Sequence, residues 1–218
     1  ARLYPGVIFD LEGGPIYIGE SAIIRPGATL VGPVWIGPHS TVLDHAVIRP
    51  NTAVGPWCKV NGEVGGSIFQ GFANKAHDGY LGDSFIGEWV NLGAGTVVSN
   101  LLNTYGLISC IPAPGLEPEP TNQQFLGPVI GDHTKTAIGT RLMTGSILHT
   151  GCMVAQSAPV SGCLAPFTWC SDAGKSLFRF DKFADVARAA MARRKVEASL
   201  AYIARLRQLH AAAAHTHR

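Results

Sequence analysis

The chain has 218 residues, and 46% of them are hydrophobic, so it is long and apolar enough to bury a core. Charged residues make up only 15%, and 26 glycines with 14 prolines favour a turn-rich β structure over a helical bundle. The formal net charge of +2, without a broad basic stretch, argues against nucleic acid as a partner, and no apolar run approaches the ~20 residues of a membrane span.

Aliphatic residues recur every six positions in the first part of the chain. Eight stand in unbroken register: Ile18, Ile24, Leu30, Ile36, Val42, Ile48, Val54 and Val60. The position four residues further on is small: Ala22, Ala28, Val34, Ser40, Ala46, Thr52 and Cys58. A hexapeptide period is typical of a β-helix, in which each hexad supplies one short strand and one corner, and the aliphatic side chain points into a narrow core. The pattern therefore predicts a parallel β-helix rather than an antiparallel sandwich.

The period is interrupted twice further along the chain. After Val60 the register slips by two, and it is expected to resume at Ile68, with Asn74 as a polar exception and these residues in phase: Tyr80, Ile86, Leu92 and Val98. Residues 101–128 have no period and include a proline-rich run, which predicts a long loop insertion. Hexads return from Ile130 onward.

These features predict an all-β body followed by α structure. The β-helix is expected to span residues 1–166, and residues 167–218 to form a mostly helical C-terminal extension. Apolar residues at helical spacing between Asp181 and His210 predict one or two amphipathic helices. The basic residues of this segment could meet a phosphate, although such a run is more often a solvated face. They are Arg188, Arg193, Arg194 and Lys195.

The stretch from Asn74 to Asn100 concentrates the side chains with chemical potential. His77 is able to accept a proton near neutral pH, since the unperturbed pKa of histidine is about 6.5. Polar groups that could position a substrate surround it in the sequence: Tyr80, Asn91 and Asn100. The Gly-Ala-Gly bend at residues 93–95 offers backbone N–H groups with little side-chain cover. This combination predicts acyl or phosphoryl transfer.

The motifs KAHDGYLGD, at Lys75 to Asp83, and VNLGAGT, at Val90 to Thr96, carry a family resemblance. They resemble the site of the C-terminal, left-handed β-helix half of the bifunctional glucosamine-1-phosphate N-acetyltransferase / UDP-N-acetylglucosamine pyrophosphorylases. The later runs GPVIGDHTKTAIGT and RFDKFADVARAAMARR resemble a divergent, sugar nucleotidyltransferase-like branch. The resemblance implies a cytoplasmic homotrimer that moves acetyl from acetyl-CoA to the amine of glucosamine 1-phosphate, without a metal.

The resemblance also implies a role for each matching residue. His77 is expected to be the general base, Glu63 the carboxylate that orients it, and Ala94 the backbone donor to the thioester oxygen. Ala94 and Asn100 are expected to contact acetyl-CoA. The sugar phosphate is expected to meet Arg49, Tyr80, Asn91 and a lysine. Gly65 and Gly66 occupy the place of the family's phosphate-binding lysine, so Lys75 or Lys59 is expected to substitute, and Ile138 stands where the family has serine.

Three other functions compete with acetyl transfer. The glycine-rich nucleotide-binding loop of the family's other half is missing from the start of this chain, so pyrophosphorylase activity is not expected. Zinc-dependent carbonic anhydrases share the β-helix, but His39 and His45 are six residues apart rather than four, and the five cysteines lack a CxxC pair. The odd, scattered cysteines fit reduced thiols in a cytoplasm. A non-catalytic domain that trimerises or regulates a sugar nucleotidyltransferase remains the alternative.

Overall fold

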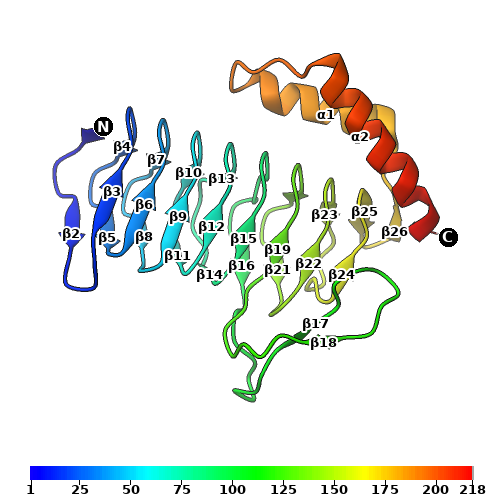
Figure 1. Ribbon diagram of the computed structural model, residues 1–218, viewed down its shortest axis with the longest axis horizontal. Coiled ribbons are helices and arrows are strands. Elements are labelled where there is room, and N and C mark those ends of the chain that lie inside the picture. Colours follow the sequence, from blue (N-terminus) through cyan, green and yellow to red (C-terminus); the bar gives the residue numbers. More distant parts are fainter. Residues whose placement is uncertain (218) are drawn as a thin grey trace.

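The computed structural model describes residues 1–217, with side chains through His215. The chain winds as a left-handed parallel β-helix from which one long loop projects, and two helices lie along one edge near its C-terminal end (Figure 1). This confirms the fold predicted from the hexads and from the family resemblance.

Each turn of the coil passes through three faces, and most turns contribute one short strand to each face. The first face contains β1 (Arg2–Leu3), β4 (Ile23–Ile24), β7 (Thr41–Val42), β10 (Lys59–Val60), β13 (Asn74–Lys75), β20 (Lys135–Thr136), β23 (Met153–Ala155) and β25 (Thr168–Ser171). Asn91 bridges β13 to β20 and so keeps this face continuous. The last parallel strand, β25, pairs with β23 and continues the coil beyond the expected boundary at residue 166.

The other two faces are built in the same way. The second contains β2 (Ile8–Asp10), β5 (Thr29–Val31), β8 (Val47–Ile48), β11 (Glu63–Gly65), β14 (Leu81–Gly82), β16 (Val97–Val98) and β21 (Arg141–Leu142). The third contains β3 (Ile16–Ile18), β6 (Val34–Ile36), β9 (Thr52–Val54), β12 (Ile68–Phe69), β15 (Phe85–Ile86), β19 (Val129–Ile130), β22 (Ile147–Leu148) and β24 (Cys163–Leu164).

The core is a single column of side chains inside the coil. From Ile24 to Val60, every aliphatic residue of the hexad register is fully buried. Val42 pairs with Val60 across the first face, so one regular turn consists of three hexads. Burial of these aliphatic groups, at roughly 25 cal/mol per Å², is the main force that holds the strands in register.

The register predicted after Val60 is wrong by one residue over the next turn. The inward positions are Val64, Phe69, Lys75 and Leu81, whereas Ile68 is 50% exposed. Val60 pairs with Lys75, so this turn is shorter than a regular one by half a hexad. The turn is shortened at more than one corner, so its inward positions are not separated by a constant number of residues. The polar side chain inside the coil is therefore Lys75 and not Asn74.

The insertion at residues 101–128 leaves the coil after β16 and returns at β19. It contains a short antiparallel pair, β17 (Ser109–Cys110) and β18 (Glu119–Pro120), and an antiparallel bridge between Leu101 and Phe125. In Figure 1 the insertion lies on the opposite side of the coil from the two helices.

Aromatic rings line the corner between the third and first faces. Five of these corner residues have positive φ, between 53° and 61°, and stack from coil to coil: His39, Trp57, Phe72, Trp89 and His133. A non-glycine residue in this region costs roughly 1–2 kcal/mol, and ring stacking returns about 0.5–1.5 kcal/mol per pair. We call this column the aromatic ladder.

The aromatic ladder ends against the C-terminal helices. A hairpin strand, β26 (Gly174–Leu177), leads to α1 (Phe180–Ala192), α2 (Leu200–Ala213) and a 3-10 turn, Ala214–His217. We call α1, α2 and their connection the helical arm. His133 Nε2 lies 2.6 Å from the Tyr202 hydroxyl, and Phe183 packs edge-on against the His133 ring. None of the described helices has the length and hydrophobicity to span a membrane.

Candidate functional site

His77 lies on the turn that carries the chain from the first face to the second. Residues 76–79 stack directly on the Gly-Ala-Gly turn of the next coil, because the Gly95 N–H donates to the Asp78 carbonyl over 3.2 Å. A Cβ on Gly79, whose φ is +129°, would collide with the Thr96 carbonyl, so only glycine allows this close approach. The His77 side chain is exposed and has no hydrogen-bond partner within residues 1–217.

Ala94 lies on that stacked turn and presents a free backbone donor. Its carbonyl accepts from the Gly139 N–H at 2.7 Å, whereas its own N–H donates to no group in the described part of the chain. The neighbouring Gly93 N–H is held by the Thr136 hydroxyl at 3.0 Å. The turn therefore has a fixed backbone with one N–H available to an outside acceptor.

The second face brings four of the predicted residues together. Arg49 Nε donates to Glu63 Oε1 over 2.9 Å, and Asn100 Nδ2 lies 3.0 Å from the Tyr80 hydroxyl. Burial raises the pKa of Tyr80, and the nearby Asp83 carboxylate raises it further, so the phenol stays neutral and able to donate at pH 7. Within the described residues no hydrogen bond joins Glu63 to His77, and Glu63 is instead paired with Arg49.

An open groove of about 420 Å³ runs along the second face beside this cluster. Tyr80 lines it on one coil, Asn100 on the next, and Arg141 and Met143 on the coil after that. Its volume falls in the range of small-molecule sites, roughly 300–1,000 Å³.

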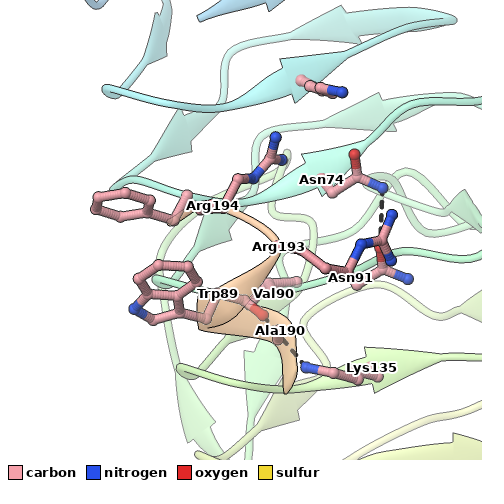
Figure 2. Close-up of a pocket in the computed structure, with 10 residues that line it drawn as sticks. Asn74, Trp89, Val90, Asn91, Lys135, Ala190, Arg193 and Arg194 are labelled. Atoms are coloured by element: carbon pink, nitrogen blue, oxygen red, sulfur yellow. Dashed lines mark hydrogen bonds between the residues drawn. The ribbon is translucent and has the colours of Figure 1, made fainter. Parts of the chain in front are cut away.

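Asn91 lies apart from this cluster, on the first face. Its side-chain oxygen accepts from Asn74 Nδ2 over 2.8 Å. Figure 2 shows this pair facing the C-terminal end of α1. The predicted site residues of one chain are thus divided between two faces, with His77 and Ala94 on the turns between them.

The prediction that Lys75 meets the substrate is corrected by its position. Its side chain is 2% exposed and lies inside the coil, where Nζ donates to the carbonyls of Asn61 (3.0 Å) and His77 (2.8 Å). The shortened turn after Val60 places this lysine at an inward position. Lys75 therefore holds the backbone of His77 from within, whereas Lys59, one strand away, is exposed.

Two further residues of the site were not predicted. The Asp83 carboxylate accepts from Asn100 Nδ2 and so fixes the amide beside Tyr80. It stands at the end of the KAHDGYLGD motif, and that position was the available signal. The whole insertion separates Arg141 from Asn100 in the sequence, and no motif marks Arg141 as a site residue. It reaches the groove because the coil brings its strand beside that of Asn100.

Metal ligands do not gather anywhere in the described residues: no group of three or more histidine, cysteine, aspartate or glutamate side chains is placed to hold an ion. All five cysteines are free thiols.

By sequence, the chain is similar to bifunctional GlmU proteins. It is 34% identical over 87 residues to the bifunctional protein GlmU of Gloeobacter violaceus, covering 37% of this chain and 19% of that protein. With GlmU of Desulfitobacterium hafniense it shares 26% identity over 181 residues, covering 73% of this chain and 37% of that protein. The chain thus spans less than two fifths of these curated relatives.

Other comparisons add less. No protein-family model matches the chain. Among solved structures, the UDP-N-acetylglucosamine acyltransferase from Campylobacter jejuni aligns with 87% of this chain and with 83% of that chain, at 14% identity and a TM-score of 0.46. Over 73% of its length, the chain is similar in sequence to 37% of a bifunctional GlmU protein, in agreement with the resemblance that its motifs carry.

Proposed function

We propose that this chain transfers the acetyl group of acetyl-CoA to the amine of glucosamine 1-phosphate. The observation that carries the proposal is the stacking of the His77 turn on the Gly-Ala-Gly turn. The exposed His77 imidazole and the free N–H of Ala94 therefore lie on adjacent coils. A base and an oxyanion donor on neighbouring turns are the two groups that acyl transfer from a thioester to an amine requires.

In the proposed reaction, His77 takes a proton from the acceptor ammonium, and the freed nitrogen attacks the thioester carbonyl carbon. The C–N bond forms as the C–S bond breaks, and coenzyme A leaves as its thiol after taking up a proton. The Ala94 N–H stabilises the charge on the carbonyl oxygen, a contribution of about 3 kcal/mol for one donor. Glu63 keeps one carboxylate oxygen free of Arg49, and we assign to it the orientation of the imidazole.

The substrates are assigned to the two faces. Acetyl-CoA is placed in the groove beside Asn100, and the sugar phosphate is placed against Arg49, Tyr80 and Asn91. Within the described residues, both terminal guanidinium nitrogens of Arg49 are free, and a guanidinium can bind phosphate through two parallel hydrogen bonds.

The division of these residues between two faces favours a site completed by a second copy in a homotrimer.

The test is acetylation of glucosamine 1-phosphate by the wild type and by His77→Ala. We expect the variant to lose at least ~10²-fold in kcat with little change in acetyl-CoA affinity. His45→Ala is the matched control, because His45 is exposed on the corresponding turn two coils earlier. Sedimentation should report three chains for all of these proteins.

Two results would count against the proposal. If the His77 variant kept more than a tenth of the wild-type rate, another base would have to act. If the wild-type protein neither turned over nor bound acetyl-CoA in a calorimetric titration, the chain would be a non-catalytic trimerising domain.

A further inference from the structure

A second cavity, of about 280 Å³, lies between the first face and the C-terminal end of α1. Four basic side chains line it, two from the coil and two from the helical arm: Lys59, Lys135, Arg193 and Arg194. Figure 2 shows Arg193 and Arg194 reaching from the end of α1 toward the coil, with Lys135 on the opposite side. No acidic side chain among the described residues lines this space, which we call the arm cavity.

The four cations of the arm cavity have no carboxylate partner in the described part of the chain. The four ion pairs in the described part of the chain involve other arginines, none of which lines the arm cavity: Arg25, Arg49, Arg179 and Arg188. Among the described residues, Lys135 Nζ donates only to two backbone carbonyls at long range, those of His133 (3.3 Å) and Trp89 (3.5 Å). Burial lowers the pKa of Lys135 to about 8 and also lowers that of Arg194. Like charges gathered in a partly buried space are destabilising unless an anion enters.

The strands of the coil arrange polar groups in a row along one wall. Lys59 pairs with Asn74, Asn74 bridges to Asn91, and Asn91 bridges to Lys135, so these four outward positions follow one another on successive strands. At about 4.8 Å between strands, the two lysines flank the amide pair at roughly 14 Å. Asn74 donates to Asn91, which leaves the Asn91 amide nitrogen free to donate to an oxyanion.

The aromatic residues of the cavity limit the kind of ligand. Phe72 and Trp89 line it, but their rings stack on each other at 4.2 Å, and their outer faces meet Trp57 and His133. Both faces of each ring are therefore covered, and a nucleobase has no ring to stack on. The volume, about 280 Å³, also lies just below the range of roughly 300–1,000 Å³ for ligand sites, so only a small group fits.

We propose that the arm cavity binds a phosphate or diphosphate group of a small molecule and that the bound anion ties the helical arm to the coil. Such a group supplies several acceptor oxygens, which guanidinium and ammonium groups bind through short, charge-assisted hydrogen bonds. The site goes beyond acetyl transfer. Asn91 is the only residue that it shares with the proposed acceptor site.

Calorimetric titration with inorganic pyrophosphate at low ionic strength tests the proposal. We expect saturable binding of one pyrophosphate per chain, and a loss of at least ~10-fold in affinity for Arg194→Gln and for Lys135→Gln. Arg194→Lys keeps the charge but loses the two-pronged donor, so its affinity should lie between those of Arg194→Gln and the wild type. Circular dichroism should first establish that each variant is folded.

Arg188→Gln is the matched control, because Arg188 lies on the same helix, pairs with Asp185 and does not line the cavity. His77→Ala should bind pyrophosphate as the wild type does, which separates this site from the proposed chemistry. Uridine diphosphate, a diphosphate attached to a nucleoside, should bind about as tightly as pyrophosphate, since no ring is free to stack on its base.

Pyrophosphate should also slow amide hydrogen exchange in α1 of the wild type but not of Arg194→Gln. Absence of pyrophosphate binding by the wild type would overturn the proposal. An equal loss of affinity in Arg188→Gln would do the same, because it would reveal only general attraction to a basic surface. Much tighter binding of uridine diphosphate would refute the assignment to the phosphate groups alone.

Discussion

The buried Lys75 makes the free energy of unfolding depend on pH, and the substitution Lys75→Met should remove its part of this dependence. The side chain is 2% exposed, and burial lowers its pKa from 10.5 to about 8, although the nearby Asp78 opposes the change. In the unfolded chain the amine keeps its proton up to the higher value. Between pH 8 and 10.5 the unfolded state therefore binds more protons than the folded state, and the folded state gains stability as pH rises.

The size of the effect follows from the two pKa values. The difference between 10.5 and about 8 corresponds to roughly 3 kcal/mol in total. Between pH 7 and pH 9, Lys75 should raise the free energy of unfolding by about 1 kcal/mol. Lys135, with its pKa also lowered to about 8, acts in the same direction, so the wild type should show the sum of both.

Lys75→Met keeps the shape of the side chain and removes its charge. At pH 7 the variant loses two hydrogen bonds to the carbonyls of Asn61 and His77, at about 1.5–3 kcal/mol each, and regains the cost of the buried charge. The net loss at pH 7 should therefore lie between about 0 and 3 kcal/mol. The pH dependence is more diagnostic, because the variant should lack the part of the increase that belongs to Lys75.

Urea unfolding of both proteins at pH 7, 8 and 9 measures this difference. Lys59→Met is the control, since Lys59 is exposed on the neighbouring strand and its loss should leave the slope unchanged. The buried thiols of Cys58 and Cys152 titrate in both proteins and cancel in the comparison. Parallel profiles for the wild type and Lys75→Met would refute the assignment of a charged lysine to the core.

Two other side chains give independent tests. Burial lowers the pKa of His133 from 6.5 to about 3, and the positive charge of Lys135 lowers it further. As the pH falls below 6.5, the histidine is therefore protonated in the unfolded state but not in the folded state, which lowers the free energy of unfolding. The wild type should lose about 2 kcal/mol of stability between pH 7 and pH 5, and His133→Phe, which keeps a ring in the aromatic ladder, should lose less; equal losses in urea titrations would contradict this. Arg49→Ala should raise the KM for glucosamine 1-phosphate at least ~10-fold and leave that for acetyl-CoA nearly unchanged, because its free guanidinium nitrogens are assigned to the phosphate. Steady-state kinetics with both substrates decides, and a rise confined to acetyl-CoA would remove Arg49 from the acceptor site.

The sequence by itself determined the coil. Ile24 and the six aliphatic residues that follow it at six-residue intervals all point inward, because one residue per hexad can enter a core this narrow. The motifs around His77 and Ala94 were likewise readable, since residues within three hexads of each other in a β-helix come to lie on the same or neighbouring coils. The similarity to a GlmU protein over 73% of the chain agrees with the resemblance that these motifs carry.

Only the tertiary structure decided which way Lys75 points. One shortened turn moved it from the outside of the coil to the inside, and no periodicity in the sequence recorded the change. A step of one residue along a strand exchanges the core side for the solvent side, so a register error of one reverses the role of a side chain.

The arm cavity also required the folded chain. More than half of the sequence separates Lys59 from Arg194, and the basic residues of the helical arm could be interpreted from sequence as a solvated face as readily as a phosphate contact. Two of them instead turn toward the coil because the helical arm folds back along the corner that carries the aromatic ladder. Local patterns specify which residues form a helix or a hexad. Whether charged residues that are distant in the sequence lie close together depends on how the helical arm packs on the coil.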